Sequence, residues 1–488
     1  MPVSSILPRR LAQVALVAAF ALTAYAQVFL FPFTSRMPWG DEVLFLIGGQ
    51  KLAAGQTIYR DFFELVFPGA DVYYATLIRA FGSRAWIPGA TLVLLGTAIA
   101  ITTTAIASRI MPRRKAVLAG LLFLAFPFYA APIATHHWFS TELVLLALLA
   151  VLKRGRFGLV AGGALCGLAS FFTQTKGVAA LAAICLWLLW RREVRQSLAV
   201  AASFAVTLSA AMLPFVAQAG LGRVYENTFV YVLNNYTAEW FNTWRIYLAI
   251  SPRHAGVLDI PEVLAFLVVH AAVPFAYLAW ALRRRNSDAE HGDTMLLLAG
   301  VGLALFLAVA SAPNLLRLST AAAPALILVA SMLEGRVVRW ATVAVLAIVV
   351  LGVAARQRSW QSTTELPIGR VAVNSQAMQE EMEWLMARTT PGQPCFGNHV
   401  VCFNLGLRNA APAPFVMPSD YTPPEQAEAV TGAIDQEKVP LLVLRPVFYM
   451  PVERGAHDHL QNFRQYLYAN YRMAKVFANG DEAWVRTR

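Results

Sequence analysis

Long apolar stretches separated by short loops occupy the first three quarters of the chain. A helix needs about 20 mainly apolar residues to cross the hydrocarbon core of a bilayer, and most of these stretches approach that length. The pattern predicts an α-helical polytopic membrane protein with about 11 transmembrane helices. The predicted spans are residues 11–30, 86–108, 116–133, 139–152, 157–173, 177–190, 197–218, 261–282, 294–311, 319–334 and 338–355.

The basic residues alternate from loop to loop and predict an orientation. Lys and Arg cluster in every second loop, and the positive-inside rule places such loops in the cytoplasm. We therefore expect a multi-pass protein of the inner (cytoplasmic) membrane with a cytoplasmic N-terminus and a periplasmic C-terminus. No small-residue cleavage site follows the first span, so we expect it to be uncleaved. The clusters are Arg9–Arg10, Arg109–Lys115, Lys153–Arg156, Arg191–Arg195, Arg283–Arg285 and Arg336–Arg339.

Residues 68–82 form a shorter apolar segment that contains Asp71 and Arg79. We interpret it as an interfacial helix, because a short amphipathic helix of this kind lies along the membrane surface. The alternative is a further span. That alternative would invert every later loop and place the Arg109–Lys115 cluster outside, against the positive-inside rule.

The chain changes character after residue 355. Residues 1–355 form the predicted membrane module, which includes an outward loop at 31–85, and residues 356–488 form a small soluble α/β domain on the periplasmic side. Hydrophobic periodicity predicts a helix at 374–388, strands at 394–402 and 441–448, and a hairpin that turns near Asn479-Gly480.

Two of the 4 cysteines lie in apolar runs, Cys166 and Cys185, and two bracket a short loop of the tail, Cys395 and Cys402. The second pair predicts a disulfide, because the tail is expected in an oxidising compartment. Two buried thiols are the alternative.

The composition supports a membrane class. The chain is 58% hydrophobic and 14% charged, with a mean hydropathy of +0.53, which is too apolar for an ordinary soluble domain. Its net charge of +12 comes from clusters between the apolar runs. The excess of positive charge is therefore a topology signal, and we expect membrane lipids and no nucleic acid as partners.

The outward loop at 31–85 is rich in acids and aromatic residues. Asp41 and Glu42 follow the first span and begin an amphipathic helix that is expected to end at Gly55. Asp61, Glu64 and Asp71 come next and alternate with aromatic residues between positions 59 and 74. We expect the aromatic residues in the headgroup zone and the carboxylates facing a cavity, although plain membrane anchoring also explains the aromatic run.

These features resemble the GT-C glycosyltransferases, and within them the family 39-like branch of protein O-mannosyltransferases and aminoarabinose transferases. The acidic pair at 41–42 resembles that branch's acidic motif, and the run G-x-x-I-Y-R-D-F-F…P-G at 55–69 resembles its continuation. HHWFS at 136–140 and TQTKG at 173–177 resemble further elements. The chain lacks an E-K-P element before the interfacial helix, where it has Leu65-Val66-Phe67-Pro68.

The resemblance implies transfer of a sugar from a polyprenyl-phosphate carrier to a hydroxyl acceptor on the outward face, with inversion at the anomeric carbon. Such a reaction needs a carboxylate that takes the acceptor's proton and cations that hold the departing phosphate. Asp41 is the expected base and Glu42 its supporting catalytic group. The expected phosphate-binding residues are Lys176, Arg317, His136 and His137, and the further site candidates are Arg60, Asp61 and Glu64.

Each candidate also has a purely structural interpretation. Asp41 could cap the helix that follows it. Lys176 and Arg317 could extend to the lipid headgroups from the ends of their spans. His136 and His137 suit an interfacial belt, and as adjacent residues they lack the i, i+4 spacing of metal ligands on a helix.

The main rival function is a transporter or flippase of lipid-linked sugars without catalysis. Such proteins commonly contain paired repeats with broken helices, and the sequence has no such repeat. Another GT-C branch, such as an arabinosyl or oligosaccharyl transferase, is the second rival. The residues predict no cofactor, and a divalent cation stays an open alternative.

Overall fold

The computed structural model describes residues 6–153, 155–248, 256–283, 292–451 and 457–487. The chain forms two compact units. The helical unit comprises Met1–Phe31, Ala90–Ala211 and Trp244–Arg358, and the mixed unit comprises Pro32–Gly89, Met212–Thr243 and Ser359–Arg488. Each unit therefore combines three segments that lie far apart in the sequence.

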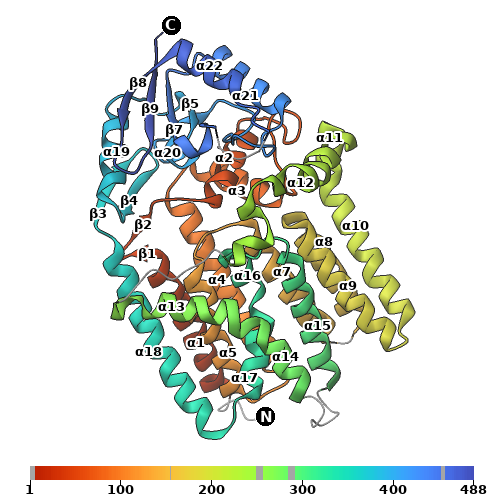
Figure 1. Cartoon of the computed structure of the whole chain (residues 1–488). Coiled ribbons are helices and arrows are strands. Elements are labelled where there is room, and N and C mark those ends of the chain that lie inside the picture. The colour runs from red at the N-terminus through yellow and green to blue at the C-terminus, as the bar shows by residue number, and fades with distance from the viewer. Residues whose placement is uncertain (1–5, 154, 249–255, 284–291, 452–456, 488) are drawn as a thin grey trace. The chain divides into compact units, whose positions relative to one another are not determined.

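The helical unit consists of long helices joined by short loops (Figure 1). Every predicted span falls on one helix or on consecutive helices of the structure. These are α1 (Ile6–Val28), α4 (Trp86–Ala107), α5 (Arg113–Ala125), α6 (Pro127–Ala130), α7 (His136–Val151), α8 (Arg156–Phe172), α9 (Gln174–Trp190), α10 (Val194–Ala219), α13 (Ile260–Leu267), α14 (Val273–Arg283), α15 (Gly292–Val309), α16 (Leu315–Ala321), α17 (Ala323–Met332) and α18 (Gly335–Ser359).

Six helices in the described part of the chain are long and apolar enough to cross a membrane, or 7 if the bent pair α16–α17 counts as one span. That pair bends by 57°. Pro324 lies in the first turn of α17, where its missing N–H interrupts the helical hydrogen bonds. Helices α7, α8 and α9 are shorter and apolar. A polytopic helical architecture is confirmed, whereas the number of 11 spans stays a prediction.

Helix α9 packs closely against α8 at a glycine, Gly177. A Cβ atom added to Gly177 would overlap the backbone of Cys166 and Ser170. The absence of a side chain thus lets the two backbones approach, as small residues do between membrane helices. Lys176 precedes this contact directly, so the same packing fixes its position.

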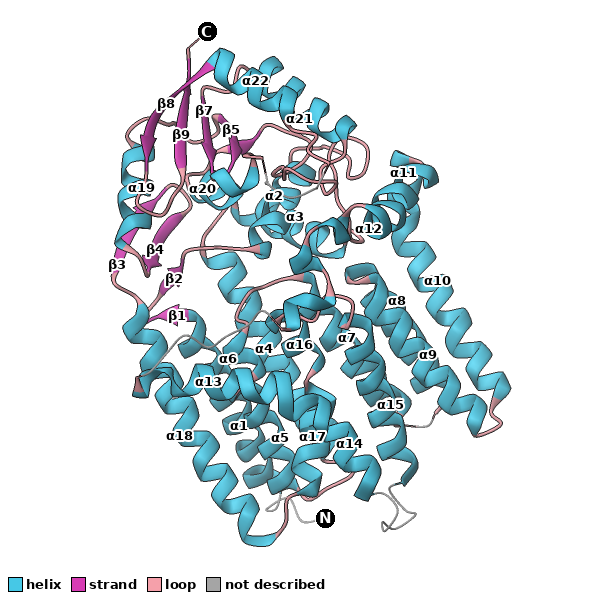
Figure 2. Ribbon diagram, in the orientation of Figure 1, coloured by secondary structure: helices cyan, strands magenta, loops and turns pink. Residues whose placement is uncertain are grey.

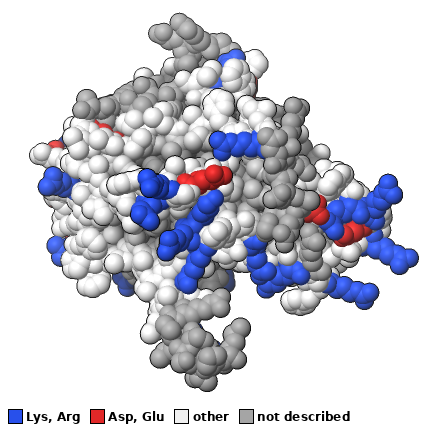
Figure 3. Space-filling view, turned by 90° about the horizontal axis from the view of Figure 1, so that it is seen from below, with Lys and Arg blue, Asp and Glu red and all other residues white. Residues whose placement is uncertain are grey.

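Basic side chains gather on one face of the molecule, where acids are few (Figure 3). In the loop after α9, Arg191 pairs with Glu193 at 3.0 Å and also with Asp293. The orientation of the chain in a membrane, which the basic loops predict, stays a prediction.

The mixed unit is built on a sheet with the order β6-β5-β7-β9-β8. Strands β5, β6 and β7 run parallel, and β8 and β9 form an antiparallel hairpin (Figure 2). Helices α21 and α22 share a hydrophobic core with the sheet. The strands are β5 (Pro394–Gly397), β6 (Arg408–Asn409), β7 (Leu441–Leu444), β8 (Tyr471–Val476) and β9 (Glu482–Arg486), and the helices are α19 (Gln376–Met386), α20 (His399–Asn404), α21 (Pro424–Gln436) and α22 (Gln461–Asn470).

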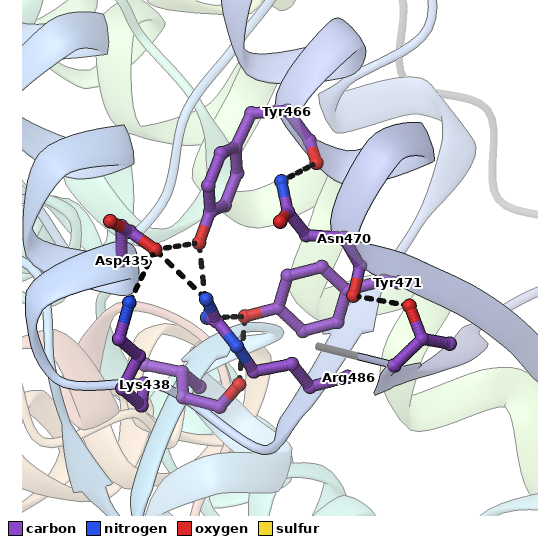
Figure 4. Close-up of polar contacts among 8 residues, drawn as sticks. Asp435, Lys438, Tyr466, Asn470, Tyr471 and Arg486 are labelled. Atoms are coloured by element: carbon purple, nitrogen blue, oxygen red, sulfur yellow. Dashed lines mark hydrogen bonds and ion pairs between the residues drawn. The ribbon is translucent and has the colours of Figure 1, made fainter.

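A polar network ties the end of α21 to the hairpin and to α22 (Figure 4). The Asp435 carboxylate accepts hydrogen bonds from Arg486 at 2.8 Å, from Tyr466 at 3.0 Å and from Lys438 at 3.1 Å. Tyr471 donates to the carbonyl of Val439 at 2.7 Å. These contacts hold the C-terminal strand in place.

A second group of strands joins the loop at 31–85 to the tail. Strand β4 (Gly369–Val373) pairs antiparallel with β3 (Ser362–Leu366) and parallel with β2 (Thr34–Arg36). The loop also contributes α2 (Asp41–Ala53) and α3 (Gly69–Phe81), which pack on each other. The segment predicted to be helical at 68–82 is helix α3, and α2 ends before Gly55 as expected. The interfacial position of α3 stays a prediction. Strand β1 (Phe29–Leu30) belongs to the helical unit.

The units divide the chain differently from the expected boundary at 355/356. Residues 32–89, expected in the membrane module, belong to the mixed unit. Backbone hydrogen bonds explain this, because Phe63 donates to the carbonyl of Pro412 at 3.0 Å and Met37 to that of Ala372 at 3.1 Å. The loop is thus bound to the tail by regular pairing.

The expected elements of the tail are confirmed with two corrections. The strand predicted at 394–402 ends at Gly397, because the Asn398 side chain accepts hydrogen bonds from the N–H groups of Val400 and Val401 and caps α20. The strand predicted at 441–448 ends at Leu444, since Pro446 begins a 3-10 turn. The helix, the hairpin and the α/β class are confirmed. The disulfide Cys395–Cys402 is also present, joining β5 to α20.

Candidate functional site

The acidic pair lies at the start of α2, and its two carboxylates have different surroundings. Gly40 occupies the N-cap position with φ 63°, a conformation that glycine adopts without strain. Asp41 is the first helical residue and is exposed. No side chain caps this helix, so Asp41 is not the N-cap.

Glu42 is buried and ion-paired. Its carboxylate accepts hydrogen bonds of 2.8 and 2.6 Å from Arg36 of β2 and one of 3.2 Å from the N–H of Trp39. Glu42 is 0% exposed and Arg36 is 5% exposed. The pair cancels its own charge in the interior, which leaves Asp41 as the acid of this turn that faces solvent.

A cleft extends along α2 within the mixed unit. Leu44, Gly48 and Lys51 line it from α2, one helical turn apart. Asp41 lies one turn before Leu44, at the head of the same stripe. It is also close enough to Tyr421, another lining residue, to interact with it electrostatically. Asp41 therefore lies near the Tyr421 side of the cleft and is not one of its lining residues.

Four aromatic residues form one side of this region. Tyr231 contacts Phe63 edge to face, with ring centroids 4.6 Å apart, and Tyr421, with centroids 5.8 Å apart. Phe415 stacks on Tyr421 at 5.7 Å. Phe63, Phe415 and Tyr421 line the cleft. We call Phe63, Tyr231, Phe415 and Tyr421 the aromatic wall.

Two ionisable residues interrupt the apolar lining. Lys51 donates a hydrogen bond to the carbonyl of Ala411 and lies over the ring of Phe62 at 5.4 Å. Burial lowers the pKa of Lys51 to about 7. Glu64 uses Oε1 to accept from the N–H groups of Leu65 and Val66, at 2.8 and 3.1 Å. Burial raises the pKa of Glu64 to about 7, so near neutral pH its carboxyl can donate as well as accept.

Asp71 supports the cleft from behind. It is 0% exposed, and neither of its carboxylate oxygens has a hydrogen-bond partner. A Cβ atom on Gly48 would overlap its Oδ1. Burial, and then the charge of Glu64, raise the pKa of Asp71 well above its ordinary value. Asp71 is therefore packed against α2 in surroundings that favour its protonated form.

Arg60 and Asp61 form a pair on the surface. Arg60 donates to Asp61 at 2.8 and 2.9 Å, and the N–H of Thr57 donates to the same carboxylate at 2.7 Å. These contacts lower the pKa of Asp61 to about 2. The Asp61 carboxylate is therefore committed to this turn.

The four expected phosphate-binding residues cluster in the helical unit. Lys176 is fully buried and donates to the carbonyl of His137 at 3.1 Å, to Thr141 Oγ1 at 2.9 Å and to Thr320 Oγ1 at 2.7 Å. All three acceptors are neutral, so its positive charge has no carboxylate among these partners. Lys176 does not extend to the lipid headgroups.

Arg317 and the two histidines surround Lys176. The side chain of Arg317 donates to the carbonyl of Ala312 at 3.2 Å and is half-buried. Both Arg317 and His136 interact electrostatically with Lys176. The rings of His136 and His137 lie 4.0 Å apart, and Thr173 contacts His136 Nδ1 at 3.0 Å. Helices α7, α9 and α16 thus gather two basic side chains, Lys176 and Arg317, and the two histidines.

The candidates divide between the units. Asp41, Glu42, Arg60, Asp61 and Glu64 lie in the mixed unit, and the four expected phosphate-binding residues lie in the helical unit. Sequence reasoning missed the partners of these residues, namely Arg36, Lys51, Thr141, Thr320, Phe415, Tyr421 and Gln426. The buried charge of Lys51 within an apolar helix was the one available signal. No group of three or more His, Cys, Asp or Glu suited to a metal occurs in the described ranges.

Comparison with known proteins identifies the fold. No protein-family model and no curated protein sequence matches the chain. Among solved structures, ArnT from Cupriavidus metallidurans bound to undecaprenyl phosphate is similar over 97% of this chain and 98% of its own, at 15% identity and a TM-score of 0.59. Apo ArnT gives 14% identity and 0.61 over 98% of both chains. An oligosaccharyltransferase from Archaeoglobus fulgidus gives 13% and 0.50, over 88% of this chain and 69% of its own. The chain has the fold of the GT-C glycosyltransferases, so that part of the resemblance is confirmed.

Proposed function

Because the chain has the GT-C fold, we propose that it transfers a sugar from a polyprenyl-phosphate-linked donor to a hydroxyl acceptor at the outer face of the cytoplasmic membrane. The acceptor oxygen attacks the anomeric carbon and inverts it. The bond from that carbon to the phosphate oxygen breaks, and the polyprenyl phosphate leaves with both electrons of the bond. The acceptor's proton passes to a carboxylate of the enzyme.

The donor class is supported by the fold and by the cation group. One structure of the same fold, ArnT, holds undecaprenyl phosphate. In this chain the Lys176 amino group is fully buried, and its described partners are all neutral. A buried charge without a counter-ion is unfavourable by several kcal/mol, so a bound anion would stabilise it.

We assign the contact with the phosphate to Arg317. The side chain of Arg317 is half-buried, whereas Lys176 is fully buried. Arg317 can bind phosphate oxygens in a bidentate manner, and Lys176 adds positive charge from behind. His136 and His137 complete the group.

Asp41 is the proposed base, and its position is the observation that carries the proposal. The Asp41 carboxylate is exposed one helical turn before the cleft residue Leu44, whereas the neighbouring Glu42 is neutralised by Arg36. Glu42 then acts by holding the first turn of α2. General-base catalysis of this kind contributes typically about 10²–10⁴-fold in rate.

The test is a comparison of the lipids and glycans of cells with and without the gene, followed by assay of the purified chain. If the chain transfers a sugar, cells without the gene should lack that sugar on one glycoconjugate. The polyprenyl-phosphate-linked donor of the sugar should accumulate in the same cells. The purified protein should release polyprenyl phosphate only when acceptor is present. Movement of the intact donor across vesicles without its cleavage would instead identify a flippase and overturn the proposal.

A further inference from the structure

We infer that the cleft along α2 binds a sugar ring of a carbohydrate acceptor. The inference rests on the proposed function and adds the chemical class of the acceptor. The cleft is formed by α2, the segment 62–65, the segment 412–421 and the start of α21, all within the mixed unit. In Figure 2 the loops of this unit surround α2 on the side toward α21.

The lining combines aromatic faces with a few polar groups, which suits a sugar. The C–H groups on the face of a sugar ring pack against the electronegative face of an aromatic ring. Phe415 and Tyr421 of the aromatic wall lie parallel to within 18°, and Phe415 is half-buried, so part of its surface stays open. Small-molecule sites generally show such an apolar lining with a few converging polar groups.

The polar groups of the cleft suit hydroxyls. Lys51 uses one ammonium proton for Ala411 in the described structure, which leaves two to donate. Glu64 uses Oε1 for backbone N–H groups, which leaves Oε2 for a ligand. Gln426, in the first turn of α21, adds an amide that both donates and accepts. A hydroxyl can donate and accept, so neighbouring hydroxyls of one ring can satisfy all three residues.

Other occupants fit the lining less well. An acyl chain would remove Lys51, Glu64 and Gln426 from water without replacing their hydrogen bonds, which is unfavourable. An extended peptide gains affinity by adding a strand to a sheet edge. None of the residues that line the cleft belongs to a strand.

The direction of the cleft links binding to reaction. The α2 stripe from Asp41 to Lys51 spans ten residues of helix, which is about 15 Å. Tyr421 interacts electrostatically with Asp41, so a sugar ring that packs against Phe415 and Tyr421 lies beside a neighbour of the proposed base. The bound ring therefore lies on the side of the cleft near Asp41.

The experiment measures binding to the full chain in lipid nanodiscs by saturation-transfer difference NMR, without donor. Nanodiscs are needed because glycoside detergents would compete. The probes are methyl glycosides of glucose, mannose and galactose, an acetylated Ser/Thr-rich pentapeptide, and octanol. We expect at least one glycoside to bind, and its affinity to fall about tenfold or more in Phe415→Ala, Glu64→Gln and Gln426→Ala. Phe33→Ala is the matched control, since Phe33 is 83% exposed and does not line the cleft, and it should bind as the wild type does.

Three results would overturn the inference: binding of the peptide or octanol in place of the glycosides, glycoside binding that the three substitutions leave unchanged, or no binding of any probe. Phe415→Ala could disturb folding, and Gln426→Ala covers that case because it changes only a half-buried side chain in the first turn of α21. The test of glycoside binding and the test of sugar transfer can be told apart when one of them fails. A chain that binds glycosides but cleaves no donor contradicts the proposed function alone, and a chain that transfers sugar at normal rate in all three variants contradicts the inference alone.

Discussion

Arg36 and Glu42 form a buried ion pair in which one guanidinium nitrogen donates to both carboxylate oxygens, at 2.8 and 2.6 Å. The pair joins strand β2 to the first turn of α2. It thereby positions Asp41, the helical residue directly before Glu42. Removing one partner leaves the other charge buried and unpaired. Truncating one partner of such a pair typically costs about 3–5 kcal/mol.

We therefore expect Glu42→Gln to lower the stability of the mixed unit by about that amount, and to reduce activity through misfolding. Thermal unfolding of the purified chain measures the change. The double variant Arg36→Met/Glu42→Leu should recover much of the lost stability, because apolar replacements remove both charges. Equal stability of Glu42→Gln and the wild type would show that the pair is not structural.

Asp41→Asn should reduce transfer by roughly 10²–10⁴-fold while leaving the melting temperature nearly unchanged. The amide keeps the size of the side chain and loses only its capacity to take the proton. The measurement is the rate of polyprenyl-phosphate release by purified variants. Asp61→Asn is the control, since the Asp61 carboxylate is committed to its own turn. Normal turnover in Asp41→Asn with loss in Asp61→Asn would move the base to Asp61.

Arg317→Gln should raise the KM for the lipid donor by roughly 10- to 100-fold, because a hydrogen bond to a charged group contributes about 1.5–3 kcal/mol. Lys176→Met should affect the donor as well, through loss of the charge behind the phosphate. Steady-state kinetics with varied donor separates KM from kcat. An unchanged KM in both variants would exclude this cation group from donor binding.

Glu381 predicts a pH dependence of the stability of the mixed unit. Burial, and then the charge of Asp481, raise the pKa of Glu381 from 4.5 to about 7. Between these values the folded state retains a proton that the unfolded state releases, so stability falls as pH rises from about 4.5 to 7. Glu381→Gln keeps an oxygen for the 2.6 Å hydrogen bond from Asn479 and abolishes the titration. Its melting temperature should vary less across this window, and a slope identical to that of the wild type would contradict the prediction.

Gly48→Ala should destabilise the chain by about 1–3 kcal/mol, because the added methyl group overlaps the Asp71 carboxylate. The penalty should shrink in an Asp71→Ala background, which a double-mutant cycle measures. Gly432→Ala in α21 is the matched control. A Cβ atom there meets nothing within 4 Å, and alanine favours a helix, so stability should hold or rise.

The helices could be predicted because a helix that contacts lipid or the protein interior needs a long run of apolar residues, and such a run is visible in the sequence. The 57° bend between α16 and α17 was less accessible, since Pro324 ends one helix and begins another within one continuous apolar run. In the tail, alternation identified the hairpin around Asn479-Gly480. The strand predicted to reach Cys402 ended at Gly397, because a single side chain, Asn398, starts a helix there.

The candidate site was predictable only in part, since its environment is assembled from distant segments. The difference between exposed Asp41 and paired Glu42 depends on Arg36, whose strand is held by β4. The far side of the cleft comes from residues 412–426, which have no periodicity that would mark them. Sequence patterns therefore identified the acids and not what surrounds them.

The pairing of β2 with β4 also sets the order of events during synthesis. Ser35 finds its partner, Val371, some 336 residues later. At about 5–20 residues per second, a ribosome needs roughly 17 to 67 s to cover that distance. The acidic loop thus emerges early, and its strand stays without its partner while most of the later helices are being made. A nascent or prematurely terminated chain can insert helices into the bilayer without ever completing the cleft.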